Sequence, residues 1–472
     1  MESAKATLDT LPEELLVAIL EHITTLPALL ALSKTSRRLH RLSLPQLYHT
    51  FPGRNSELFL RTISHSPDLA VHTKTAIWHQ ERRTVPSIDM LEKQHIVMRL
   101  AQLCVPHGTD LAQHFSNFGK HEDYWYFEVL VLFMPSLEEV QVRESWLWDD
   151  HQYWFKSLSP FFNPLCESRL RTARLDGPMR LENLVPLLTI PTLRTLEVTQ
   201  VTVMRREGFR VFQWSVWPVE KLLAERSSGL ETLSLRESYI DLELLLPLLR
   251  GVKALKSFTY EHLPNDLVDE FVLEQRVEDG ALAACLAVQR ESLEYIRVRD
   301  TEERDLIGMP QLLFDPELDY DAAHDVGKAF PNLHTLDIGP LKCIWHQINH
   351  GHETSVLKLL MANLPPSIKI LRFVASPTHH QDLERLLDIL AYAFAAEQRP
   401  LEAIEITDWD PTLGWFPENL PVLQKTYSVL GLRLISVARD ATDVYGAEPL
   451  LIDEDTEPDW IFVTDLRLAS QV

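Results

Sequence analysis

The sequence predicts an α/β protein in which a small N-terminal module of three helices is followed by an irregular solenoid of repeats with a parallel concave sheet. Two observations lead to this prediction. The stretch from Leu8 to Phe51 places apolar residues at helical spacing, between residues that start and end helices. From Pro135 onward, a six-residue strand pattern recurs with helix-forming sequence between its copies, which is typical of a solenoid.

The first helix is predicted from its start signals and its apolar stripe. Thr10 and Glu13 have the spacing of a capping box, and Pro12 stands in the predicted first turn, where its missing N–H costs no hydrogen bond. Behind them, apolar residues recur three and four positions apart, at Leu15, Leu16, Ile19, Leu20 and Ile23. One face of this helix is therefore expected to pack against a partner.

A second helical run is predicted to open at Pro27. Leucines supply its apolar positions and its far end is basic, through Leu29, Leu30, Leu32, Leu39, Lys34, Arg37, Arg38, His40 and Arg41. Pro45 is expected to break this run before Leu47 and Tyr48. Three short helices bury too little apolar area to be stable alone, so we expect them to pack against a partner helix or the following domain.

The stretch from Leu8 to Phe51 resembles an F-box. The resemblance is carried by Leu11, Pro12, Glu14, Leu15, Ile19, Leu20, Leu29, Leu32, Ser33, Lys34, Arg37, Leu39, Leu42, Pro45, Leu47 and Tyr48. Many F-boxes have Trp at the position of Leu39 and Val at that of Leu32, but both replacements are apolar. The alternative interpretation is a capped amphipathic hairpin outside that family. The resemblance implies that a Skp-type adaptor binds through Leu11, Pro12, Leu15, Ile19, Leu20, Leu29 and Leu32.

Composition narrows the class of protein. The chain has 472 residues, of which 45% are hydrophobic and 24% charged, as in soluble folded proteins. Its net charge of −23 repels phosphate backbones and argues against nucleic-acid partners. We find no signal peptide or membrane span, so we expect no membrane partner and a cytoplasmic or nuclear location. Four cysteines lie far apart, as expected for reduced thiols, at Cys104, Cys166, Cys285 and Cys343.

Between the module and the repeats, the region from Pro52 to about Leu130 has no clear repeat. Apolar spacing predicts a helix from Ile88 to Leu103. A weaker hypothesis places a hydrolase in this region. The expected domains are the module at residues 8–51, a helical linker region at 52–130, the solenoid at 131–426 and a C-terminal capping segment at 427–472.

The strand pattern has the form L-x-x-L-x-L, with other apolar residues allowed at its L positions. Its nine copies begin at Leu137, Leu170, Leu193, Leu230, Leu255, Leu293, Leu333, Ile368 and Leu401. Helical candidates lie between copies at Leu181–Leu188, Val219–Ala224, Leu242–Leu249, Ala281–Val288, Val356–Met361 and Leu383–Phe394.

Strand, loop and helix in this order resemble a leucine-rich-repeat solenoid. The distance between copies varies from 193 − 170 = 23 residues to 333 − 293 = 40, whereas regular repeats run about 20–29 residues. We therefore expect insertions, such as Thr301–Val326. The alternative is an ordinary α/β domain, whose strands would be more continuously apolar. Near the end of the chain, Val429–Val437 and Trp460–Val463 are predicted to be strands of a cap.

Within each copy, the residue between the last two apolar positions should point to the concave face, because side chains alternate along a strand. These residues are all polar, namely Gln141, Arg174, Glu197, Ser234, Thr259, Arg297, Asp337, Arg372 and Glu405. The residue after the last apolar one should share this face, which adds Arg143, Asp176, Thr199, Arg236, Glu261, Arg299, Gly339, Val374 and Thr407.

Five arginines on this face are candidate target-binding residues, namely Arg174, Arg236, Arg297, Arg299 and Arg372. A guanidinium binds a carboxylate or phosphate through two hydrogen bonds, so one interpretation is a site for an acidic or phosphorylated segment. The other interpretation is that the arginines pair with acids of neighbouring copies, namely Glu197, Glu261 and Asp337.

Two further clusters each have two interpretations. The aromatic residues of Glu144–Phe155 are binding anchors if exposed and core if buried. The other cluster consists of Cys343, His346, His350 and His352. These residue types can bind zinc, but the histidines can also be ordinary residues of a loop. We find no catalytic motif, and we expect a non-catalytic protein without cofactors.

An F-box followed by leucine-rich repeats resembles the fungal-type substrate receptors of SCF-type cullin-RING ubiquitin ligases. The resemblance implies a Skp-type adaptor and a cullin as partners. It also implies that the repeats hold an unidentified target protein for ubiquitin-dependent degradation. The alternative is a protein-interaction scaffold that binds the adaptor without recruiting a cullin.

Overall fold

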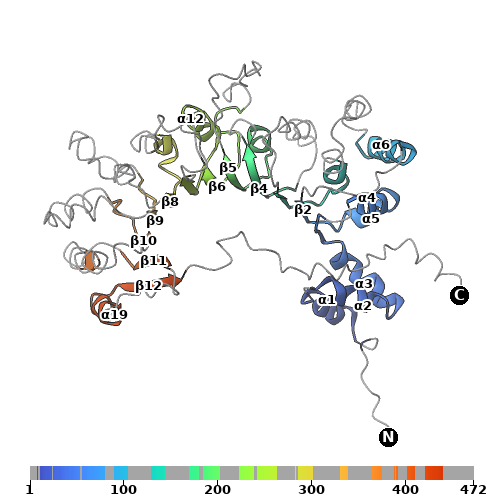
Figure 1. Cartoon of the computed structure of the whole chain (residues 1–472), viewed down its shortest axis with the longest axis horizontal. Coiled ribbons are helices and arrows are strands. Elements are labelled where there is room, and N and C mark those ends of the chain that lie inside the picture. Colours follow the sequence, from blue (N-terminus) through green and yellow to red (C-terminus); the bar gives the residue numbers. More distant parts are fainter. Residues whose placement is uncertain are drawn as a thin grey trace, which may run out of the picture. The chain divides into compact units, whose positions relative to one another are not determined.

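A computed structural model of the chain (Figure 1) describes residues 8, 11–23, 25–53, 56–79, 90–104, 129–143, 169–179, 184–201, 223–238, 242–262, 282, 285–300, 330–338, 364–374, 387, 390–391, 401–409 and 420–438. These residues belong to two compact units. The first holds the described residues of Met1–Gly177 and Thr189–Leu193, and the second holds those of Pro178–Leu188 and Arg194–Leu451.

The first unit begins with the three predicted helices, α1 (Glu13–Glu21), α2 (Leu26–Ser33) and α3 (Arg37–Leu47). The predicted capping box is wrong, because the N-cap residue of α1 is Pro12. Pro12 has an extended ψ of 148°, and its side chain makes no capping hydrogen bond. The helix therefore starts one residue after the proline, where Glu13 and Glu14 face the positive end of the helix dipole. Thr10 lies outside the described residues.

The second helical run divides at a different place from the one predicted. The chain leaves the helix after Ser33, and the Ser36 Oγ atom accepts a hydrogen bond of 3.2 Å from the Leu39 N–H, which caps α3. Pro45 lies inside α3 and does not end it, so the predicted break there is wrong. Close to the C-terminal end, a proline removes one backbone hydrogen bond while its φ stays helical.

Side chains from all three helices form the core of this module. Leu16 and Leu20 of α1 are buried together with Leu29 of α2 and Leu39 of α3. Transfer of such side chains out of water stabilises the module by about 1.5–3 kcal/mol each. The remaining positions of α1 are mostly exposed.

The first unit continues with strands and helices in alternation. Its strands are β1 (Thr50–Phe51), β2 (Thr75–His79), β3 (Glu139–Arg143) and β4 (Thr172–Met179), and β1 to β4 pair in this order as parallel neighbours. Its further helices are α4 (Ser56–His65), α5 (Pro67–Ala70) and α6 (Met90–Cys104). Helix α6 confirms the helix predicted from Ile88 to Leu103.

Strands β1 and β2 were not predicted from the sequence. In the register of the sheet, Ala76 pairs with Val140 and Trp78 with Val142, so β2 is a further copy of the strand pattern. Its first apolar position is taken by the buried Thr73. Thr73 and Ala76 stand where most other copies have larger apolar side chains, so the sequence did not reveal this copy of the pattern.

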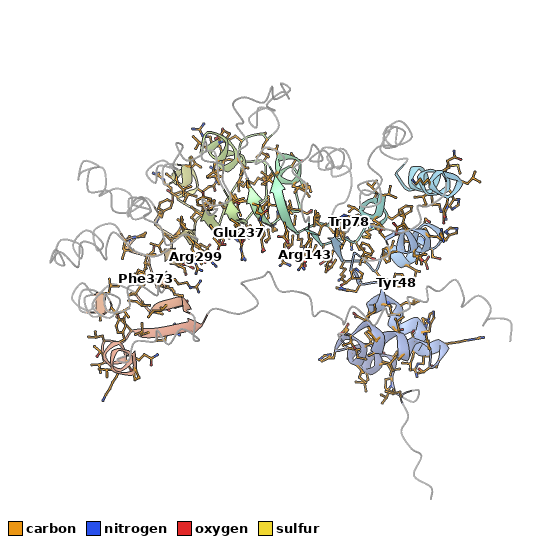
Figure 2. All side chains as sticks on the ribbon, in the orientation of Figure 1. Tyr48, Trp78, Arg143, Glu237, Arg299 and Phe373 are labelled. Carbon is orange, nitrogen blue, oxygen red and sulfur yellow. The ribbon has the colours of Figure 1, made fainter. Side chains whose placement is uncertain are left out.

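An aromatic cluster connects the end of α3 to the first strands. The ring centroid of Phe51 lies 4.7 Å from that of Phe59 and 6.4 Å from that of Trp78, and Tyr48 lies 6.0 Å from Phe59. All four side chains are buried, and Figure 2 labels Tyr48 and Trp78. Aromatic pairs at these distances contribute about 0.5–1.5 kcal/mol beyond their burial. The module is thus packed directly against β1, α4 and β2.

The second unit holds the remaining strands in chain order, each parallel to its neighbours. They are β5 (Thr195–Val201), β6 (Thr232–Ser238), β7 (Ser257–His262), β8 (Tyr295–Asp300), β9 (Thr335–Ile338), β10 (Ile370–Val374), β11 (Ala403–Trp409) and β12 (Arg433–Ala438). The helical elements are α10 (Val185–Leu188), α12 (Leu242–Gly251), η6 (Ala287–Gln289) and α19 (Leu420–Val429). Figure 1 shows α12 on one side of these strands.

The nine copies of the strand pattern all lead into strands, β3 to β11, which confirms the predicted α/β class with a parallel, solenoid-like sheet. In β7, for example, the apolar positions Leu255, Phe258 and Tyr260 are buried. The backbone adds a regular link between copies. The Lys256 carbonyl accepts hydrogen bonds of 2.8 and 3.0 Å from the N–H groups of Glu294 and Tyr295. The same link recurs at the carbonyls of Arg194, Glu231, Glu294, His334 and Lys369, so it joins the strands from β5 to β11 at their first residues.

The predicted helices between copies and the predicted C-terminal strands are confirmed only in part. Helix α12 confirms the candidate at Leu242–Leu249, and α10 forms the end of the candidate at Leu181–Leu188. Val429 belongs to α19, and Gly431 turns the chain with a φ of 75°, so the strand predicted at Val429–Val437 begins only at Arg433. The segments Val356–Met361, Thr301–Val326 and Trp460–Val463 lie outside the described residues. Among the residues described, no helix has the length and apolarity that crossing a membrane requires.

Candidate functional site

Helix α1 presents apolar side chains to solvent. Leu15 is 53% exposed and Ile19 is 42% exposed, although their neighbours Leu16 and Leu20 are buried. Residues four apart lie on the same side of a helix, and Pro12 precedes Leu15 on that side. We call Pro12, Leu15 and Ile19 the α1 stripe. An exposed apolar stripe on a helix that already has a buried face indicates a contact surface for a partner.

The seven predicted adaptor-binding residues divide between surface and core. The three residues of the α1 stripe are exposed, and Leu11 and Leu32 are half-buried. Leu20 and Leu29 are buried in the core of the module. The last two side chains therefore support the helices from inside.

Charged side chains hold the start of α1 in place. The Glu13 carboxylate pairs with Arg41, and its Oε1 atom lies 3.6 Å from the Arg38 Nε atom. The Arg38 Nη2 atom also donates a hydrogen bond of 2.8 Å to the Leu11 carbonyl. These contacts attach the first turn of α1 to α3 and so fix the position of the α1 stripe.

The second candidate surface is the polar face of the sheet in the second unit. The side chains between the last two apolar positions align across neighbouring strands, as their alternation predicts. In register these are Glu197, Ser234, Thr259, Arg297, Asp337, Arg372 and Glu405. We call the side of the sheet that carries this row the polar face.

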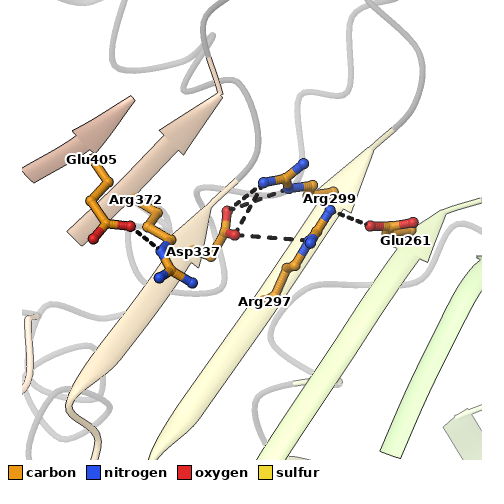
Figure 3. Close-up of polar contacts among 6 residues, drawn as sticks. All are labelled: Glu261, Arg297, Arg299, Asp337, Arg372 and Glu405. Atoms are coloured by element: carbon orange, nitrogen blue, oxygen red, sulfur yellow. Dashed lines mark hydrogen bonds and ion pairs between the residues drawn. The ribbon is translucent and has the colours of Figure 1, made fainter. Parts of the chain in front are cut away.

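A four-residue ion-pair network occupies the polar face at β7, β8 and β9 (Figure 3). Arg297 lies between two acids, with its Nη2 atom 2.6 Å from Glu261 and its Nε atom 3.8 Å from Asp337. Arg299 donates to Asp337, with an Nη2–Oδ2 distance of 3.1 Å. Burial lowers the pKa of the Arg299 guanidinium, although the Asp337 charge opposes this shift.

Arg372 on β10 forms a separate pair. Its Nε atom donates a hydrogen bond of 2.5 Å to Glu405 on β11, and its guanidinium lies 5.8 Å from the ring centroid of Tyr295, within the range of a cation–π contact. Burial raises the pKa of the Tyr295 hydroxyl above its ordinary value, and the Asp337 charge adds to the rise. Tyr295 was missed by the sequence prediction, although it lies two residues before Arg297 and hence on the same face.

The arginines predicted to bind a target thus have different surroundings. Arg297 and Arg299 pair with Glu261 and Asp337, as the second interpretation of the sequence predicts, whereas Arg372 pairs with the acid of the next strand, Glu405. In the first unit, Arg174 pairs with Glu139. Arg236 on β6 is exposed. On β7 to β11, the three arginines of the network and the separate pair therefore face three acids, and their charges balance.

The aromatic cluster and the Cys–His cluster of the sequence analysis fall in parts of the chain that the structure does not describe. Glu144–Phe155 and the segment from Cys343 to His352 lie outside the described residues. Within the ranges that are described, no group of three or more His, Cys, Asp or Glu side chains is arranged to hold a metal ion.

Comparison with known proteins identifies the helical module. The sequence model of the F-box-like family matches residues 8–51, which contain α1, α2 and α3. The chain therefore carries an F-box-like domain, and such domains typically bind Skp-type adaptors. No curated protein matches the chain significantly.

Proposed function

We propose that the chain is the target-binding subunit of an SCF-type cullin-RING ubiquitin ligase. The F-box-like domain binds a Skp-type adaptor through the α1 stripe, and the polar face of the repeat strands binds a target protein. The chain contributes no catalytic group of its own. It acts by holding target lysines near the conjugating enzyme, which raises their effective concentration.

The observation that carries the proposal is the exposure of Leu15 and Ile19 inside a matched F-box-like domain. Leaving such side chains in water forgoes about 1.5–3 kcal/mol each, and a partner groove recovers this free energy. Their position on one side of a helix fits recognition of a helical stripe by an apolar groove.

The aromatic cluster of Tyr48, Phe51, Phe59 and Trp78 supports the same role. It joins the F-box-like domain to β1 and β2 by packed side chains, so the domain is mounted on the first strands. A rigid mount suits a receptor, because proximity accelerates a reaction only when the geometry is held.

The adaptor arm is tested with the double variant Leu15→Asp and Ile19→Asp, which places two charges in the proposed groove. We expect the tagged variant to lose co-purification with the Skp-type adaptor while its circular dichroism stays unchanged. The matched control is Val422→Asp, which adds a charge at an exposed valine of α19 in the second unit. Recovery of the adaptor with the folded double variant would contradict the proposal.

The ligase arm is tested in the same pull-down by probing for a cullin. We expect the cullin to follow the adaptor in the wild-type sample and in Val422→Asp, and to be lost with the double variant. Adaptor without cullin would overturn the ligase assignment and leave an adaptor-binding scaffold.

A further inference from the structure

The polar face changes character between β7 and β8. Across β5, β6 and β7, small hydroxyl residues align in two rows, one of Thr195, Thr232 and Ser257 and one that includes Ser234 and Thr259. From β8 onward, the second row continues with Arg297, Asp337, Arg372 and Glu405, which form the ion pairs described above. We call these five hydroxyl residues the hydroxyl floor. Each of these hydroxyls can both donate and accept hydrogen bonds.

Ser234 lies near the centre of this floor and lacks a partner. The residue is only 5% exposed, and its Oγ atom makes no hydrogen bond to any residue that the structure describes. Leaving a buried hydroxyl unsatisfied costs about 1–3 kcal/mol, and such a group usually has a protein, water or ligand partner. The floor therefore holds a hydrogen-bonding group that the described part of the chain leaves unsatisfied.

Arg236 lies two residues after Ser234, and hence on the same face of β6. Its side chain is exposed. Nowhere in the described part of the chain does a carboxylate pair with its guanidinium, in contrast to Arg297, Arg299 and Arg372. The positive charge of Arg236 is thus available at the edge of the hydroxyl floor.

Building on the target-binding role proposed above, we propose that the hydroxyl floor docks an extended segment of the target protein, and that Arg236 binds one Asp or Glu carboxylate of that segment. The hydroxyls of the floor exchange hydrogen bonds with polar groups of the segment. Ser234 obtains its missing partner from the segment or from a water that the segment holds.

Charge balance favours a carboxylate over a phosphate. One unpaired guanidinium offsets one negative charge, and the carboxylates of Glu261, Asp337 and Glu405 already neutralise the other arginines. A phosphate monoester carries about two negative charges at neutral pH. The second negative charge of the phosphate would lack a positive partner. It would also lie close to Glu237, in a chain whose net charge is −23.

The test uses the full chain in complex with the adaptor and four immobilised peptide libraries. Each library fixes one central residue, which is Glu, phosphoserine, Ala or Lys, and randomises its flanks. We expect the Glu library to retain the complex best, by about tenfold over the Ala library, as for one charge-assisted hydrogen-bonded pair. Arg236→Ala should remove this preference, and Arg236→Glu should transfer it to the Lys library.

Controls separate the floor from general effects. Arg290→Ala removes an exposed arginine beside η6 and should leave the preference unchanged. Ser234→Ala should weaken retention on the Glu library by about threefold without loss of folding, because it deletes only the unsatisfied hydroxyl. The adaptor is measured in every eluate. Loss of the adaptor from the wild-type complex would argue against the proposed function and not against the floor.

Stronger retention on the phosphoserine library than on the Glu library would overturn the assignment to a carboxylate. An unchanged Glu preference in Arg236→Ala, with the adaptor still bound, would overturn the site itself.

Discussion

Arg299 donates hydrogen bonds to both carboxylate oxygens of Asp337, and Asp337 is only 2% exposed to solvent. Asp337→Asn keeps the shape of the side chain but leaves Arg297 and Arg299 without that negative charge. We expect the free energy of unfolding to fall by about 3 kcal/mol, because breaking a buried pair strands the opposite charge. Urea denaturation measures this change.

The matched control for Asp337→Asn is Glu402→Gln. It breaks an exposed pair in which the Glu402 and Lys369 atoms are 3.4 Å apart, and it should cost less than about 1 kcal/mol. Equal losses in the two variants would show that the Asp337 network is no stronger than a surface pair.

Leu15 and Leu16 are neighbours in sequence with opposite expected effects. Leu16 is 1% exposed, so Leu16→Ala should lower the free energy of unfolding of the domain by about 3 kcal/mol. Leu15→Ala should change stability by less than about 0.5 kcal/mol but weaken adaptor binding by about tenfold. Thermal unfolding and titration with purified adaptor measure the two quantities. A stable Leu16→Ala domain or an unaffected adaptor titration for Leu15→Ala would contradict this division.

Gln289 is a buried polar residue that links three backbone groups. Its Nε2 atom donates to the carbonyls of Leu249 and Val252 at 2.7 and 2.9 Å, and its Oε1 atom accepts from the Leu255 N–H at 3.0 Å. Gln289→Leu removes these bonds, and we expect a loss of about 3 kcal/mol in the free energy of unfolding. The exposed neighbour Val288→Ala serves as the control and should change stability little. Chemical denaturation that finds both variants alike would contradict the role of Gln289.

Stability at high pH should depend on Tyr48. Burial raises the pKa of its hydroxyl above the ordinary value of about 10. The folded state therefore keeps the proton longer than the unfolded state does. Stability from this group is complete below about pH 10 and is lost as the pH rises through the folded-state pKa. In urea denaturation from pH 8 to 11, Tyr48→Phe should lose less stability than the wild type. Identical pH dependence in both proteins would rule out this contribution.

The sequence predicted the strands well where leucine or a similar residue filled the pattern. Nine copies led to nine strands, and the three apolar positions are buried wherever the structure describes their side chains. It failed at β2, where Thr73 and Ala76 replace the large apolar residues while still being buried. It also misplaced the end of α3, since the local preference of Pro45 was weaker than the packing of the whole helix.

The candidate site was only partly predictable. Alternation along each strand placed Arg297, Asp337 and Arg372 on one face, and their pairing was one of two open interpretations. The choice of partner depends on side-chain length and rotamer across strands, which sequence spacing does not specify. Likewise, nothing in the sequence distinguished Arg236 from the paired arginines. Among the described residues no carboxylate pairs with its guanidinium, and Glu261 on the neighbouring β7 pairs with Arg297 instead.

The backbone links between successive strands have an evolutionary consequence. Because the Lys256 carbonyl and its counterparts hold each strand through main-chain groups, the side chains of the polar face are free to vary without loss of register. Under the function proposed above, substitution of a few hydroxyl or charged residues on β5 to β7 would change the target without moving the strands. The proposed adaptor binding would persist, since the α1 stripe lies in the F-box-like domain at residues 8–51.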